Sequence, residues 1–220
     1  MTLTAEQALR FYRLWIPLLD YVNQKYRIDQ SLYGMTSPEG LPIASIKKIR
    51  DKLWSDRQLI DSYVQRNPNH LSDTDLAILM GWKNAIADSF TVLRHLKSGS
   101  IFIPMSVMDA AYIVSGIYSP WDEMLRGAPL PQVIDAVLIP FENKIICDSV
   151  IVPYSVRLVG QMRSSLNDHT TERSKHPAMY SKPFQTRDKR IFFTFIFPVY
   201  QKYSRITVEG SSSCFFYQLF

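Results

Sequence analysis

The chain has 220 residues and a formal net charge of +5, and its 46% hydrophobic and 20% charged residues are typical of a soluble globular protein of one or two domains. It has no apolar run near the roughly 18 residues that span a bilayer, no secretory signal at its start, and too few cysteines for a disulfide framework. We therefore expect a cytoplasmic protein without a membrane segment. The whole basic excess lies in residues 174–220, which hold 7 basic and 2 acidic residues, so the net charge is weak evidence for nucleic-acid binding.

The first part of the chain is predicted to be helical. Thr4 and Gln7 have the spacing of a capping box, in which two side chains satisfy free N–H groups at the start of a helix. Apolar residues then recur every three or four positions, and Pro17 is expected to kink the helix because it removes one backbone hydrogen bond. The apolar stripe consists of Leu9, Tyr12, Ile16 and Leu19, widened by Phe11, Trp15, Leu18 and Val22. So wide a stripe needs burial on two sides, which we expect other helices to provide.

Shorter helices follow a loop. Gly and Pro residues mark residues 31–42 as a loop, and the apolar spacing predicts helix over Ile43–Gln65. The polar segment Ser55–Gln58 has a second capping-box spacing and is expected to divide this stretch into two helices. Ser72 and Asp75 then predict the start of a further helical segment.

Near Asp88 the spacing of apolar residues changes to alternation, which predicts β-strands. Residues 89–96 and 100–105 form a predicted hairpin around a turn that contains Gly99. A third strand is predicted over Ala110–Tyr118.

A second hairpin is predicted over Val133–Phe141 and Lys144–Val152, and Asn143 in its turn is expected to take the left-handed conformation. Five short strands with small turns favour a curled antiparallel sheet or a small barrel, because closure protects strand edges. Val156–Leu166 is expected to add a closing helix. The predicted fold class is therefore α+β, with an N-terminal helical region packed on a small antiparallel β-sheet or barrel-like domain.

We divide the chain into a helical region (1–87), a small β-domain with its closing helix (88–170) and an aromatic and basic tail (171–220). From Ser174 onward the tail is dense in Phe and Tyr but shows little alternation. One hypothesis is that it derives from an altered reading frame or a diverged end and is poorly packed. Deleting residues 174–220 and measuring thermal unfolding tests this hypothesis, since a large loss of stability would contradict it.

Four stretches, DLAILMGWKNAI, FTVLRHLKSGSIF, YIVSGIYSPWDEM and AVLIPFENKIICD, resemble a family of bacterial proteins that has no assigned function. The resemblance covers roughly residues 8–165. It implies a cytoplasmic bacterial protein with helices ahead of a small β-domain. It carries over no activity, cofactor or catalytic residue.

Cys147 and Asp148 form the first candidate site. A catalytic cysteine needs a nearby cation or a helix N-terminus to stabilise its thiolate, and the nearest histidine in sequence, His169, lies beyond the strand. On an alternating strand Cys147 shares a face with Ile145, which favours a small buried core residue. Asp148 is expected to end the strand or to pair with a cation such as Lys144.

Trp121 lies in a predicted helical turn, Ser119–Leu125, in which Ser119 is the expected cap and Pro120 the first helical residue. Its indole can plug the end of a barrel, which we favour, or present a flat surface to a partner, with Tyr118 stacked beside it. The candidate partner-binding residues are Tyr118, Trp121, Lys144 and Asp148.

The remaining sequence patterns point away from catalysis. The four histidines show no metal-binding spacing, and the chain has no G-x-S-x-G, phosphate-loop or dinucleotide motif. We therefore expect no metal, no cofactor and no catalytic residue.

The leading interpretation is a non-enzymatic cytoplasmic module that binds a protein partner. A first alternative is weak nucleic-acid binding through the β-domain and a basic helix. The basic residues of that helix are Lys47, Lys48, Arg50 and Lys52. Acidic neighbours make an ordinary solvated helix face the favoured explanation of this run. A second alternative is a hydrolase whose residues converge only in three dimensions.

Overall fold

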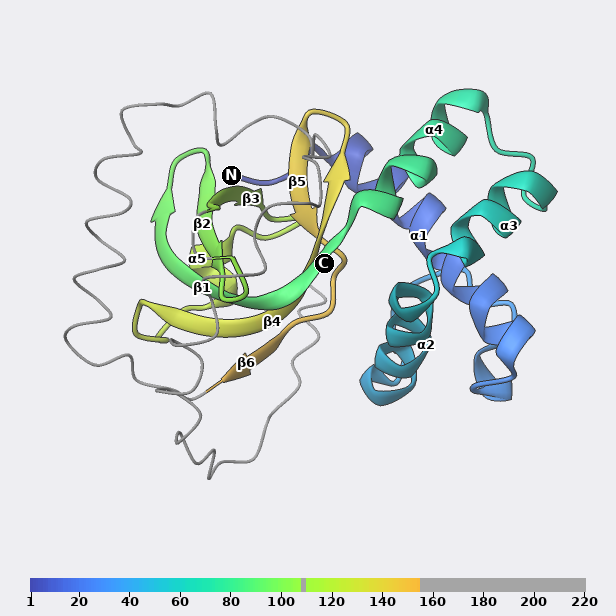
Figure 1. Cartoon of the computed structure of the whole chain (residues 1–220), viewed down its shortest axis with the longest axis horizontal. Coiled ribbons are helices and arrows are strands. Elements are labelled where there is room, and N and C mark those ends of the chain that lie inside the picture. Colours follow the sequence, from blue (N-terminus) through green and yellow to red (C-terminus); the bar gives the residue numbers. More distant parts are fainter. Residues whose placement is uncertain (108–109, 155–220) are drawn as a thin grey trace, which may run out of the picture.

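The computed structural model describes residues 1–107 and 110–154. Helices come first and a β-barrel follows, which confirms the predicted α+β fold class (Figure 1). The helices are α1 (Ala5–Tyr26), α2 (Ile43–Ser55), α3 (Gln58–Arg66) and α4 (Asp73–Gly81), with 3₁₀ turns η1 (Gln30–Leu32) and η2 (Trp82–Asn84). The strands are β1 (Ile86–Leu96), β2 (Gly99–Pro104), β3 (Tyr112–Ser115), β4 (Gln132–Phe141), β5 (Lys144–Cys147) and β6 (Val152–Tyr154), and the short helix α5 (Trp121–Met124) precedes β4. The expected closing helix (Val156–Leu166) and the tail (171–220) fall outside the described residues.

The capping box at the start of α1 is formed as predicted. Gln7 N donates to Thr4 Oγ1 at 3.2 Å, and Thr4 N donates to Gln7 Oε1 at 3.1 Å. The helix then continues through Pro17 for 22 residues in all. The predicted apolar stripe is buried apart from Tyr12, which is partly exposed, and Leu9, which is 65% exposed. Leu9 therefore lies at the edge of the stripe and not in the core.

The predicted division of the second helical stretch is confirmed, but its cap differs. Gln58 N donates to Asp56 Oδ1 at 3.2 Å, whereas the Ser55 hydroxyl donates to a carbonyl within α2 at 2.9 Å. The expected capping box at Ser55 is therefore wrong. The predicted start of α4 is correct, because Asp75 N donates to Ser72 Oγ at 3.3 Å.

The barrel closes because β1 pairs with both β2 and β4, so that β1, β2, β3, β5 and β4 form a ring (Figure 1). A register shift between Val92 and Arg94 marks a bulge. Such a bulge bends a strand, and the bent β1 pairs with β4 along its first part and with β2 along its second. β3 and β5 are parallel, so the barrel is mixed and not wholly antiparallel. β6 pairs with residues 133–135 of β4, and the opposite edge of the same residues pairs with β1.

The second hairpin departs from the prediction after Cys147. β5 ends there, and the chain passes through Ser149, which has a φ of 76°, before β6 pairs elsewhere on β4. In the hairpin turn Glu142, with a φ of 50°, takes the left-handed conformation that we predicted for Asn143. The expected cap at Ser119 is also wrong, because α5 begins without a side-chain cap.

β4 lies between two hydrophobic cores. Its residues Ile134 and Leu138 belong to the core inside the barrel, whereas the alternate residues Val137 and Ile139 belong to the core of the helical region. This follows from the two-residue period of a strand, which sends successive side chains to opposite faces. The helical region and the barrel therefore share a strand that is buried on both faces.

Candidate binding groove

A groove of about 950 Å³ runs along the outer side of α1. α1 lines it with residues three or four positions apart, from Leu9 to Gln24, and this wall is about 22 Å long at 1.5 Å per residue. The loop after η1, the corner between α3 and α4, and Tyr118 from the barrel supply the rest of the lining. The groove thus combines parts of the helical region and of the barrel.

Tyrosine rings form much of the apolar lining. Tyr12 and Tyr118 stack with their ring centroids 5.7 Å apart and their planes at 11°, and Tyr21 and Tyr63 meet edge to face at 5.4 Å. Tyr118 is 44% exposed, and Leu9 lines the same groove with its largely exposed side chain. Aromatic and aliphatic surface is therefore presented to solvent along one concave face.

The charge of the groove is concentrated at Asp20 and Glu39. Asp20 accepts hydrogen bonds from Gly34 N at 2.9 Å and from Gln24 Nε2 at 2.8 Å, and neither donor is charged. Within the described residues neither carboxylate makes an ion pair. Burial, and then the charge of Asp20, raises the pKa of Tyr63 to about 12, so that hydroxyl stays neutral at physiological pH. This end of the groove carries negative charge without a cationic partner.

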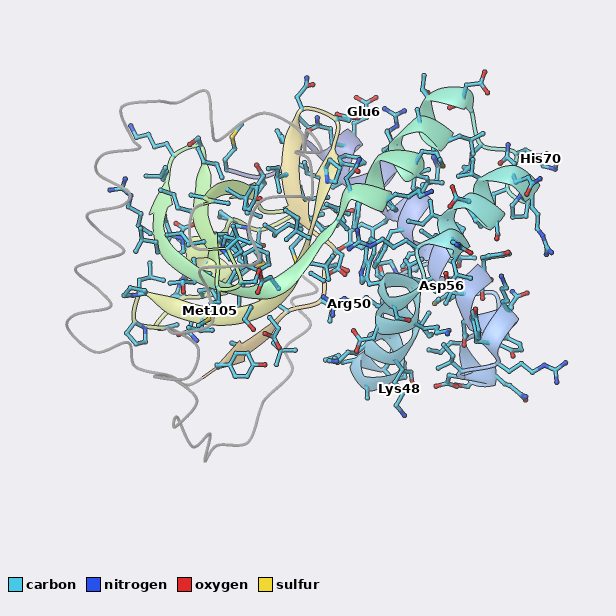
Figure 2. The ribbon with its side chains drawn as sticks, in the orientation of Figure 1. Glu6, Lys48, Arg50, Asp56, His70 and Met105 are labelled. Carbon is cyan, nitrogen blue, oxygen red and sulfur yellow. The ribbon has the colours of Figure 1, made fainter. Side chains whose placement is uncertain are left out.

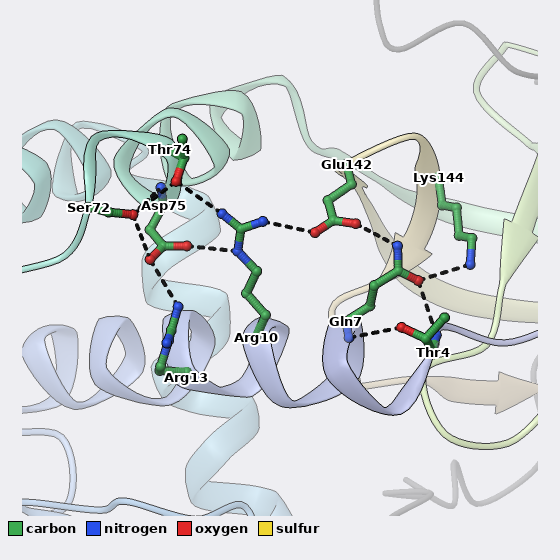
Figure 3. A network of polar contacts seen from close by, with 9 residues as sticks. All are labelled: Thr4, Gln7, Arg10, Arg13, Ser72, Thr74, Asp75, Glu142 and Lys144. Atoms are coloured by element: carbon green, nitrogen blue, oxygen red, sulfur yellow. Dashed lines mark hydrogen bonds and ion pairs between the residues drawn. The ribbon is translucent and has the colours of Figure 1, made fainter.

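A polar network fixes α1 against its neighbours (Figure 3). Arg10 Nε donates to Asp75 Oδ1 at 2.8 Å, and Arg10 Nη1 donates to Glu142 Oε1 at 3.0 Å. Gln7 Nε2 donates to Glu142, and Lys144 Nζ donates to Gln7 Oε1 at 3.2 Å. The start of α4 and the turn between β4 and β5 are thereby tied to the same face of α1.

Asp75 is the most buried charged group of this network. Burial opposes its charged form, but hydrogen bonds from Arg10 and Ser72 outweigh that cost and lower the pKa of the carboxyl group. Arg13 Nη2 also pairs with Asp75 Oδ2 at 3.0 Å, and Arg13 lines the groove. The cation that borders the groove is therefore already paired with a carboxylate.

The structure assigns Asp148 a different partner from the one expected. Its carboxylate is fully buried and accepts hydrogen bonds from Arg50 and from Trp54 Nε1, the latter at 2.7 Å. Arg50 lies at the junction of α2 and the barrel (Figure 2). Lys144, the expected cation, instead donates to Thr2 O at 3.1 Å. Asp148 thus joins two parts of the fold and offers no surface to a partner.

Of the other two candidate residues, only Tyr118 lines the groove. Trp121 is 3% exposed and meets Phe102 edge to face at 4.8 Å inside the barrel, which is the plugging arrangement that the sequence favoured. Tyr118 stacks on Tyr12 of α1. The four candidates are therefore not brought together into one site.

Cys147 has the properties of a core residue. It is 3% exposed, and burial and the charge of Asp148 raise the pKa of its thiol far above the ordinary range. A thiol that stays protonated is a poor nucleophile. The geometry therefore gives no support to cysteine chemistry at this position.

A serine and a histidine do meet on the barrel. His95 Nδ1 lies 2.7 Å from Ser100 Oγ, and the two residues are directly opposed on β1 and β2. Ser100 is only 2% exposed, and burial lowers the pKa of His95. Such a contact is typical of cross-strand neighbours.

In the described part of the chain no group of three or more His, Cys, Asp or Glu side chains is placed to hold a metal ion.

Of the four basic residues of α2, only Lys48 is exposed with neither an ion pair nor a ring contact among the described residues, so α2 carries no free cationic stripe. Lys47 Nζ pairs with Asp51 at 2.5 Å, Arg50 is buried, and Lys52 Nζ lies 4.2 Å from the centre of the Tyr26 ring.

Among the helices that the structure describes, none has the length and apolar character that crossing a membrane requires.

Most of the groove was not predicted from sequence. The spacing of apolar residues predicts the stripe that contains Leu9 and Tyr12, but it places the whole stripe in the core. Asp20 and Tyr21 of α1 and Tyr63 of α3 carry no motif, and Tyr63 reaches the groove only because α3 packs beside α1. The one sequence feature that indicates a groove here is an apolar stripe on α1 that is too wide for a single packing partner to cover.

Comparisons of the chain with protein-family models, with curated proteins and with solved structures gave no match. The resemblance to a bacterial family therefore stays a prediction.

Proposed function

We propose that this protein is a non-enzymatic interaction module of a bacterial cytoplasm, and that its groove binds an extended segment of a partner protein. The observation that carries the proposal is the tyrosine-lined groove of about 950 Å³ that leaves Leu9 and Tyr118 exposed. Its volume is at the upper end of the range of about 300–1,000 Å³ that is usual for ligand pockets. Exposed aromatic rings in a concave site are typical anchors for a partner.

The length of the groove fits an extended chain. The wall from Leu9 to Gln24 accommodates about seven residues at roughly 3.1 Å per residue, the rise of a polyproline helix. Such a segment has no internal hydrogen bonds, so one of its carbonyl groups can accept a bond from Tyr118, the groove tyrosine that is 44% exposed. Grooves lined by aromatic rings are a recurrent mode of binding proline-rich segments.

The charge of the groove specifies one feature of the partner. Asp20 and Glu39 lack a cationic partner among the described residues, whereas Arg13 is paired with Asp75. A lysine or arginine in the bound segment would complement the acidic end. The preferred ligand is therefore an extended segment with proline or other apolar residues and at least one basic residue.

The contacts of the basic residues favour this function over nucleic-acid binding. Lys47 is paired with Asp51, and Arg50 is buried against Asp148. A hydrolase gains little support, because the thiol of Cys147 is buried and Ser100 is not exposed.

Selection of random heptapeptides against the full chain tests the proposal. We expect enrichment of sequences that combine proline or apolar residues with Lys or Arg. A selected peptide should bind Tyr118→Ala or Leu9→Glu at least about tenfold more weakly than the unaltered chain, as measured by fluorescence anisotropy. Asp20→Asn should reduce the preference for basic peptides.

Tyr33→Ala is the matched control, because Tyr33 is 41% exposed but does not line the groove. Absence of enrichment, or equal effects of Tyr33→Ala and Tyr118→Ala, would contradict the proposal. Tight binding of an oligonucleotide that weakens steeply between about 50 and 200 mM salt would favour the nucleic-acid alternative.

A further inference from the structure

The outer wall of the barrel holds an apolar patch that faces away from the helical region. Leu93 of β1 and Ile101 and Ile103 of β2 form a hydrophobic cluster of their own, and they are only 6%, 2% and 3% exposed. Ile101 and Ile103 point outward, because Phe102 between them belongs to the core inside the barrel. Helices α1 to α4 lie on the other side of the barrel from β2 (Figure 1). We call these three residues, Leu93, Ile101 and Ile103, the outer patch.

Within residues 1–107 and 110–154, the neighbours of the outer patch belong to the barrel itself. Ala111 packs against the patch from the same outward face, because the next residue, Tyr112, packs against the core inside the barrel. The short helix α5 also contacts β2, but from the inside, where Trp121 meets Phe102. One face of a sheet reaches such low exposure only under a second packed layer. Residues 108–109 are too few to cover side chains from two strands, so this layer must come from residues 155–220.

The chain leaves the described part of the structure at the edge of this same face. Tyr154, the last described residue, pairs with Val133 of β4. Val133 and Ile103 both pair with Thr91 of β1, and Val133 and Thr91 are themselves buried. Directly opposed residues share a face of the sheet, and three strand-to-strand steps of about 4.8 Å place Ile103 no more than about 14 Å from Tyr154. The residues that follow Tyr154 therefore start beside the outer patch.

The segment that follows has the apolar spacing of a helix that packs on one side. In the predicted closing helix, Val156–Leu166, apolar residues three and four positions apart fall on one side: Leu158, Val159, Met162 and Leu166. The opposite side carries polar residues: Arg157, Gln161 and Ser164. Eleven helical residues at 1.5 Å per residue span about 16 Å, which is enough to reach from Tyr154 to Ile103.

We propose that the outer patch is an intrachain docking site, and that residues 156–166 occupy it with the apolar side of the closing helix. The segment follows β6 directly, so its docking is intramolecular and is favoured over a second copy of the chain by a high effective concentration. The polar side of the helix, with Arg157 and Gln161, then faces solvent. This docking does not depend on the groove or on what the groove binds.

A nitroxide on the polar side of the segment tests the contact in the full chain. Cys214→Ala removes one native cysteine, Gln161→Cys supplies the attachment site, and brief labelling spares Cys147 because it is buried. We expect the ¹³C-methyl signals of Ile101 and Ile103 to lose most of their intensity, while that of Ile60, in the core of the helical region, keeps it. Ile101→Val and Ile103→Val assign the two signals.

The matched control places the same nitroxide at Asp73→Cys, an exposed position of α4, where it should leave both outer-patch signals intact. Intact Ile101 and Ile103 signals under the Gln161 label would overturn the proposal. So would broadening that arises only when a nitroxide-labelled chain is mixed with a ¹³C-labelled chain without nitroxide, because a second copy would then cover the patch.

A disruptive substitution provides a second measurement. In an Ile103→Cys, Cys214→Ala chain, Met162→Glu should raise the rate at which a disulfide reagent modifies residue 103 several-fold, whereas Gln161→Glu on the polar side should not. Cys147 reports in the same samples whether the barrel stays closed, since its buried thiol should remain slow. Equal rates for Met162→Glu and Gln161→Glu would contradict the docking. If Met162→Glu also exposes Cys147, the nitroxide result decides.

Discussion

Arg50 in α2 and Asp148 after β5 form a buried two-point ion pair, with Nε–Oδ2 at 2.6 Å and Nη2–Oδ1 at 3.3 Å. Trp54 Nε1 and Val150 N donate to the same carboxylate, at 2.7 and 3.2 Å. Removing two charges from water is costly, and it is offset only where the geometry is good and the remaining lone pairs are satisfied. Asp148 meets both conditions, so this contact fastens the helical region to the barrel.

Breaking this pair should be strongly destabilising. We expect Arg50→Met to lower the free energy of unfolding by about 3–5 kcal/mol, because it leaves a buried carboxylate without its cation. Arg50→Met combined with Asp148→Leu should cost less than the sum of the two single changes. Urea denaturation of the four proteins measures the coupling.

Lys47→Met is the control for that experiment, because the Lys47–Asp51 pair is exposed and spaced as i and i+4. Its loss should cost no more than about 0.5 kcal/mol. An effect of Arg50→Met as small as that of Lys47→Met would show that the buried pair does not hold the two regions together.

The local features of the fold can be predicted from the amino-acid sequence, whereas the pairings between distant residues cannot. The capping box at Thr4 and the hairpin at Gly99 depend on neighbours along the chain, so their spacing is visible in the sequence. The partner of Asp148 lies 98 positions away, and nothing in the sequence distinguishes Arg50 from the nearer Lys144. The groove was missed for the same reason, because its walls come from separate elements.

A pair of neighbouring substitutions in α1 tests which residues face the core. Phe11 is fully buried, and Phe11→Ala should lower the free energy of unfolding by about 3–5 kcal/mol, since it removes core contacts and leaves a cavity. Leu9 is 65% exposed, and Leu9→Ala should change stability by no more than about 0.5 kcal/mol. A large cost for Leu9→Ala would mean that the groove wall is covered in solution, which would remove the basis of the binding proposal.

The ion pairs of Asp75 predict that the free energy of unfolding decreases at acid pH. The pKa of Asp75 is lower in the folded chain than in the unfolded one, so its contribution is full above the unfolded value of about 3.9 and is lost as the pH falls through the folded value. Asp75→Asn should therefore be less stable near neutral pH and should lose less stability on acidification. Asp73→Asn, an exposed change in the same helical turn, should leave the acid profile unaltered. Parallel acid profiles for Asp75→Asn and the unaltered chain would contradict the assigned role.

The reactivity of Cys147 separates a core thiol from a catalytic one. Burial raises the pKa of this thiol, so near pH 8 it should remain protonated and react with a disulfide reagent far more slowly in the native chain than in urea. Cys214 lies outside the described residues, and Cys214→Ala leaves Cys147 as the single thiol. The native rate should be limited by opening of the barrel, so it should rise with added denaturant and change little between about pH 7 and 9. Fast modification in the native state, with a rate that follows thiolate formation across this interval, would mean an accessible nucleophile and would favour the hydrolase alternative over the interaction module.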